Sequence, residues 1–175
     1  MVDPFELEDR LLASLRRALA REIGSGPAPA HSRPSDPAAP ERLQQALRYL
    51  ERHDHEASVD GAIAILERLI ESEGDTAATQ GALARACLFK YELTKQRAWE
   101  ARAAHSAART AELAPDAPET LLAVGDLHRV AGRFADADRE YGLALAQRPR
   151  YFEAMLGRAR ALAGLGRVDE AVAQC

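Results

Sequence analysis

A spacing of 34 residues recurs through the second half of this 175-residue chain. The residues that follow it are two prolines, two Gly-Arg pairs and three alanines: Pro115 and Pro149, Gly132-Arg133 and Gly166-Arg167, and Ala103, Ala137 and Ala171. This period is typical of a helical hairpin, a unit that cannot bury its apolar face alone and therefore stacks on further copies of itself. The chain is expected to be an all-α solenoid of antiparallel helical hairpins.

One copy, residues 118–151, shows the pattern most clearly. Its marked positions are Leu121, Val124, Gly125, His128, Ala137, Tyr141 and Pro149. This arrangement resembles the tetratricopeptide (TPR) repeat, whose pattern is W-x2-L-G-x2-Y, then A-x3-F, then P. The small residues Gly125 and Ala137 let the two helices approach closely where they cross. Gly132 can adopt the positive φ that terminates the first helix, and Pro149 ends the second.

The same register continues towards the C-terminus in a copy at 152–175. Its small and turn residues are Ala159, Gly166 and Ala171. A full copy of about 34 residues would run past Cys175. We therefore expect this copy to be truncated and the chain to be a fragment.

Two earlier copies are expected, at about 40–76 and 77–117. The first has Ser58 as a helix N-cap. The second is seven residues longer than the period, because Ala62 and Ala103 lie 41 residues apart. Seven residues are about two helical turns, so the insertion lengthens both helices of the hairpin. The aromatic side chains near its tip form either a binding knob or a packing surface for the preceding hairpin, and we favour packing; they are Phe89, Tyr91 and Trp99.

The region before the repeats divides in two. Residues 1–24 are expected to form an amphipathic helix with Asp3 as N-cap and Pro4 at its first position. Residues 25–39 are rich in Pro, Gly, Ser and Ala and predict a flexible linker. The helix needs a partner surface, and docking on a protein is favoured over an anionic membrane because acidic residues offset its arginines.

Composition limits the function classes. The net charge of −4 is too mild to imply nucleic acid binding. No apolar run approaches the ~20 residues needed to span a bilayer, and the acidic start is unlike a signal peptide. We therefore expect a cytoplasmic protein. Cys87 and Cys175 do not indicate a disulfide framework.

Several segments together resemble the C-terminal TPR region of bacterial multidomain serine/threonine protein kinases. The most distinctive is Lys90-Tyr91-Glu92-Leu93-Thr94-Lys95, followed by Trp99; the others are residues 49–54, 113–115, 125–128 and 132–134. The opening residues 5–19 are similar to the last helix of a TolB-like domain. The resemblance implies a tail that recruits or senses partners for a catalytic domain located elsewhere.

Catalytic, cofactor and metal motifs are not expected in this chain. The glycines at 24–27 do not form a phosphate-binding loop, and no D-F-G occurs. His53-Asp54-His55-Glu56 offers metal-ligand types, but a hairpin tip is ordinarily polar. His105 and His128 are expected to pack rather than to act as bases, since neither has a nucleophile beside it.

The first helices of successive hairpins are expected to line a concave groove. The residues placed there by register are Arg85, Leu122, Asp126, Arg129, Leu156 and Arg160. Arginines mixed with leucines suit an extended peptide with acidic and apolar side chains. The double change Asp126→Lys and Arg160→Glu is expected to abolish capture without unfolding the array.

Three functions stay open. The leading one is a protein-interaction scaffold that binds a peptide or partner domain. The second is the regulatory tail of a larger bacterial signalling enzyme. The third is a homo-oligomer that assembles through the apolar edge left by the truncated repeat.

Overall fold

The computed structural model describes residues 38–173, which contain eight helices. They are α2 (Ala38–Glu51), α3 (Glu56–Glu73), α4 (Ala77–Thr94), α5 (Arg97–Leu113), α6 (Pro118–Val130), α7 (Phe134–Gln147), α8 (Phe152–Gly164) and α9 (Val168–Ala173). The helix predicted at 1–24 and nearly all of the linker lie outside the described residues.

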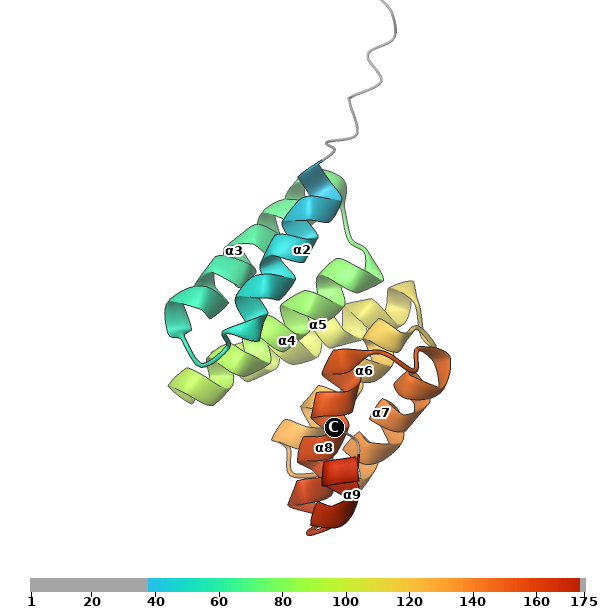
Figure 1. Ribbon diagram of the computed structural model, residues 1–175. Coiled ribbons are helices and arrows are strands. Elements are labelled where there is room, and N and C mark those ends of the chain that lie inside the picture. The colour runs from blue at the N-terminus through green and yellow to red at the C-terminus, as the bar shows by residue number, and fades with distance from the viewer. Residues whose placement is uncertain (1–37, 174–175) are drawn as a thin grey trace, which may run out of the picture. The chain divides into compact units, whose positions relative to one another are not determined.

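The helices form four successive hairpins, α2–α3, α4–α5, α6–α7 and α8–α9 (Figure 1). Each second helix packs on the first helix of the next hairpin, and the first helices α2, α4, α6 and α8 also contact one another in order. Nearest-neighbour packing of this kind defines a solenoid. The all-α, TPR-type fold class is therefore the observed one.

The turn within a hairpin repeats after 34 residues. Gly132 and Gly166 have φ values of 74° and 76°. The next amide in each turn reaches back to the last turn of the helix: Arg133 N–H donates to the His128 carbonyl at 2.8 Å, and Arg167 N–H donates to the Leu162 carbonyl at 2.9 Å. These bonds satisfy carbonyls that the helix end leaves unpaired. The predicted role of both glycines is confirmed.

The prolines mark helix ends in the same periodic way. The last amide bonded before Pro115 is that of Ala114, which donates to Thr110 at 2.9 Å. Before Pro149, Arg148 N–H donates to Ala144 at the same distance. Proline has no N–H with which to continue either helix.

Tyr141 of α7 is fully buried where three helices meet. A Cβ atom built on Gly125 of α6 would lie 2.8 Å from its ring, and one on Gly157 of α8 would lie 2.6 Å from it. Both glycines therefore make room for the ring. The sequence analysis named Gly125 and missed Gly157, choosing Ala159 as the small residue of α8. Ala159 is partly exposed, so for the contact with α7 the assignment is corrected to Gly157.

The aromatic residues of the long second hairpin pack against the first. Phe89 is buried and stacks on His53, with ring centroids 4.4 Å apart. Trp99 packs on the same apolar core, and the cations of Lys90 and Arg102 lie 5.9 and 5.4 Å from its ring centroid. The packing interpretation is confirmed for Phe89 and Trp99.

Lys90 of α4 is buried and holds the start of α3. Its ammonium donates to Glu56 at 2.7 Å and to Asp60 at 2.6 Å. Burial acts to lower the pKa of Lys90, but these two carboxylates raise it above its ordinary value. The N-cap of α3 is His55, so the prediction of Ser58 was wrong: the Ser58 amide already bonds to the His55 carbonyl inside the helix.

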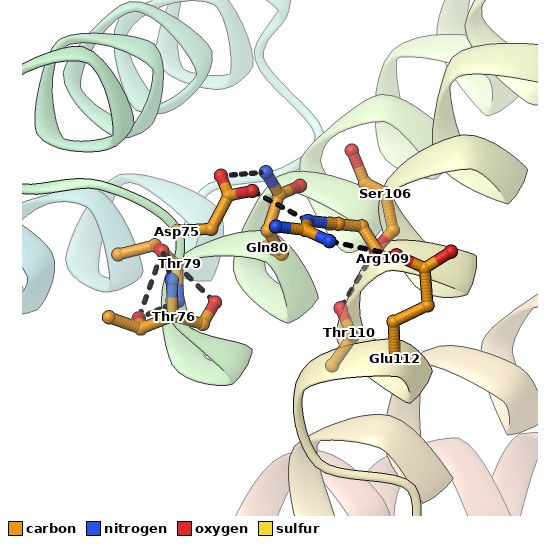
Figure 2. A network of polar contacts seen from close by, with 8 residues as sticks. All are labelled: Asp75, Thr76, Thr79, Gln80, Ser106, Arg109, Thr110 and Glu112. Atoms are coloured by element: carbon orange, nitrogen blue, oxygen red, sulfur yellow. Dashed lines mark hydrogen bonds and ion pairs between the residues drawn. The ribbon is translucent and has the colours of Figure 1, made fainter.

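A polar network joins the α3–α4 loop to α5 (Figure 2). Asp75 accepts a hydrogen bond from Gln80 at 2.8 Å and one from the Arg109 guanidinium at 2.7 Å. The Arg109 bond is the main reason why the pKa of Asp75 lies below its usual range. Next to it, Thr76 and Thr79 form a capping box that starts α4. The loop is therefore fixed to both helices of the second hairpin.

Candidate peptide-binding groove

Two adjoining cavities lie among the first helices of the hairpins. The larger, about 550 Å³, extends from α2 across Arg85 and Phe89 of α4 to the start of α8. The smaller, about 390 Å³, adds Leu122 of α6 to the lining. Both are lined by Gln44, Leu47, Arg85 and Glu153. We call this continuous depression the groove.

The groove offers apolar surface at its α8 side. Phe152, the first residue of α8, is 68% exposed. It lines the larger cavity with Leu156 one turn further on, opposite Leu47 of α2. An exposed aromatic ring beside a cavity is a suitable contact for an apolar side chain of a ligand.

Most arginines near the groove already have carboxylate partners. Arg85 lies 3.3 Å from Asp126 and 3.7 Å from Glu153. Arg148 donates to Glu119 at 2.8 Å. The Arg85 pairs link the first helices α4, α6 and α8, and the Arg148 pair joins the end of α7 to α6. These arginines are not free charges for a ligand.

Arg129 belongs to the same class of engaged arginines. It donates to Glu92 of α4 at 2.9 Å and lies 3.9 Å from Asp126. Burial acts to lower its pKa, but the two carboxylates hold that pKa above its ordinary value. Arg129 does not line either cavity. Arg129 was predicted to line the groove, but in the structure it joins α4 to α6.

Asp126 is a structural residue as well. It is 8% exposed and accepts a 2.5 Å hydrogen bond from the Tyr141 hydroxyl. Burial, followed by the charge of Asp126, raises the pKa of Tyr141 well above its ordinary value, which keeps the donor proton in place. A lysine at 126 would meet Arg85 and Arg129. The structure therefore does not support the expectation that Asp126→Lys leaves the fold intact.

The other predicted groove residues divide as follows. Arg85 and Leu156 line the groove. Leu122 also lines it but is only 2% exposed and belongs to the core between α6, α7 and α8. Arg160 lies on α8 beyond the cavity lining, where its guanidinium is 3.3 Å from Nε2 of His53.

The sequence analysis missed the α2 side of the groove. Leu47, Arg48 and His53 line it. Their signal was available, since α2 is the first helix of its hairpin just as α4 and α8 are. Phe152 was also missed, because it was used only to mark the start of a repeat.

Among residues 38–173, the histidines and acidic residues considered as metal ligands or bases do not come together in one site. No group of three or more His, Cys, Asp or Glu is placed to hold a metal ion there. Nε2 of His55 lies 3.4 Å from a carboxylate oxygen of Asp54, whereas the ring of His53 stacks on that of Phe89. His105 is exposed on α5, and His128 is partly buried. None of the described helices has the length and apolar character of a membrane span.

Comparisons with known proteins add little to this description. No family model matches the chain, and no curated protein matches it. Seven chains of solved structures do match. One of them, MamA AMB-1, is 20% identical over 78% of this chain and 68% of its own, with a TM-score of 0.41. This likeness is too distant to carry an argument, so the fold assignment rests on the repeated geometry described above.

Proposed function

We propose that this chain is a protein-interaction scaffold that binds an extended peptide in the groove between α2 and α8. The observation that carries the proposal is the exposed Phe152 beside a cavity of about 550 Å³ whose floor and walls come from three different hairpins. Such a surface matches alternating apolar contacts along a peptide, with polar groups at the rim.

The proposal is tested by selecting binders from a library of random 12-residue peptides displayed on phage. The selected peptides are then measured against Phe152→Ser, which removes an exposed groove ring without opening the core. Leu143→Ser is the matched control, because Leu143 of α7 is 49% exposed and lines neither groove cavity. Loss of binding in the first variant and retention in the second support the groove; equal binding by both variants contradicts it.

A regulatory tail of a larger signalling enzyme is the alternative that the resemblance to kinase tails favours. The most distinctive residues of that resemblance also have structural roles here: Lys90 joins α4 to α3, and Lys95 ends α4 in a left-handed conformation. The mass of the native protein in its source cells tests this alternative. A product much larger than this chain supports it, and one of its size removes it.

Self-association is the third proposal and rests on three exposed apolar residues near the last hairpin: Leu165, Val168 and Val172. Sedimentation equilibrium decides it. Mass that rises with concentration in the wild type, and not in Val168→Ser with Val172→Ser, supports self-association. A strict monomer contradicts it.

A further inference from the structure

Arg160 differs in its partner from three of the arginines around the groove. Arg85, Arg129 and Arg148 each face a carboxylate. Among the described residues, Arg160 instead has the imidazole of His53, which lies 107 positions away in the chain and lines the larger cavity. A guanidinium that is not paired with a carboxylate of the protein can still bind a ligand carboxylate through two N–H groups.

His53 is held in place rather than free on the surface. Its ring stacks on Phe89 with an interplanar angle of 21°, and it lines the larger cavity. Its Nε2 accepts the Arg160 N–H only while that nitrogen carries no proton. The pair therefore stands at the edge of the groove with one permanent cation and one switchable cation.

The charges around His53 come from every neighbouring element. Arg160 is the nearest, and the guanidinium of Arg85 on α4 lies over the Phe89 ring, 5.6 Å from its centroid. The remaining charged groups nearby are Arg48, Glu51, Asp54, His55 and Glu153. Of the two glutamates that line the cavity, Glu153 is engaged by Arg85. No carboxylate is bonded to His53 among the described residues.

We propose that His53 and Arg160 form a carboxylate subsite of the groove, which takes an acidic side chain of the peptide while a neighbouring apolar side chain lies against Phe152 and Leu156. The proposal rests on the function proposed above and adds the chemistry of the ligand. It also assigns the subsite a pH dependence. A proton on His53 removes the bond from Arg160 and places two cations together, and a ligand carboxylate between them relieves that repulsion.

Proton uptake by His53 and carboxylate binding therefore favour each other. Acid favours the protonated form of an imidazole, whereas the ligand's carboxyl group stays ionised down to pH ~4.3. Affinity for an acidic peptide should accordingly rise as the pH falls from 7.5 to 5.5. A peptide with a neutral isostere has no charge to couple and should show no such rise.

The test uses the full chain and two blocked dipeptides, acetyl-Leu-Glu-amide and acetyl-Leu-Gln-amide. Histidine ring resonances are followed by NMR at both pH values in a buffer without phosphate. We expect the Glu peptide to shift the His53 ring and to bind at least about fivefold more tightly at pH 5.5 than at 7.5. The Gln peptide should bind with the same weak affinity at both values.

Three variants separate the contributions. His53→Phe keeps an aromatic ring on Phe89 and should abolish the pH dependence. Arg160→Gln should weaken binding of the Glu peptide at both pH values and leave binding of the Gln peptide unchanged. His105→Phe, at an exposed position on α5, is the control and should behave as the wild type.

The failures are distinguishable. If both peptides shift the resonances of groove residues equally at both pH values, the proposal of a carboxylate subsite is contradicted and the proposed groove function stands. If neither shifts any groove residue, both proposals are contradicted. If inorganic phosphate moves His53 as strongly as the Glu peptide does, the pair is a general anion site and the peptide assignment is overturned.

Discussion

The Tyr141 hydroxyl donates a 2.5 Å hydrogen bond to Oδ1 of Asp126, and this bond lies at the point where α6, α7 and α8 meet. Asp126 in turn faces Arg85 of α4. One carboxylate thus connects the buried centre of the third hairpin to the floor of the groove. The shape of the groove therefore depends on the buried pair Tyr141 and Asp126, which a ligand in the groove need not contact.

Replacing Tyr141 by Phe should destabilise the fold by about 1–3 kcal/mol, because a hydrogen bond to a buried charged acceptor is lost while the ring is kept. Urea unfolding followed by circular dichroism measures this. An unfolding midpoint equal to that of the wild type would mean that the arginines satisfy Asp126 without the hydroxyl.

Gly157→Ala and Gly142→Ala should change stability in opposite directions. A Cβ at 157 would lie 2.6 Å from the Tyr141 ring, so the variant should lose about 1–3 kcal/mol through overpacking. A Cβ at 142 in α7 meets nothing within 4 Å, so that variant should gain up to about 1 kcal/mol from helix propensity. The same unfolding experiment gives both values. A gain of stability in both variants would show that helix propensity alone governs both sites.

Gly132→Ala should destabilise by about 1–2 kcal/mol, because its φ of 74° lies in the left-handed region that Cβ disfavours. Gly132→Asn should cost less, since asparagine tolerates this conformation better. Calorimetric melting temperatures rank the three proteins. A melting temperature for the Ala variant at or above that of the Asn variant would contradict the strained turn.

Stability should fall with acid in a way that depends on Asp75. The pKa of this carboxyl group is lowered in the folded state, chiefly by the Arg109 bond. Its contribution is therefore present above the unfolded pKa of about 3.9 and is lost as pH falls through the folded value. Asp75→Asn should be less stable than the wild type at pH 6 and should approach it below pH 4. Parallel curves at all pH values would exclude Asp75 as a contributor.

The features that the sequence predicts well are local ones. Gly132, Gly166 and the two periodic prolines act on their own helix ends, so a fixed spacing is enough to place them. The Tyr141–Gly157 contact shows what the spacing leaves out. One repeat earlier the same two positions are Ala107 and Ala123, which lie in one buried cluster. A larger side chain on one helix demands a smaller one on the next, and that exchange is visible only when the helices are packed.

The candidate site was predicted only in part for a related reason. Helical register identifies which face of a first helix points to the groove, and Arg85 and Leu156 do line it. Register says nothing of the partner that a charged side chain finds on another helix. Asp126 accepts a hydrogen bond from Tyr141, and Arg129 donates one to Glu92. The bond between Arg160 and His53 joins residues from the first and last hairpins, which no periodicity connects.

The most direct test of the peptide-binding groove is an NMR measurement of intermolecular contacts between the labelled protein and a peptide selected from the displayed library. The proposal predicts nuclear Overhauser effects from the peptide to the Phe152 ring and the Leu156 and Leu47 methyl groups, which come from opposite walls of the larger cavity. Contacts confined to the second helices α3, α5 and α7 would contradict it.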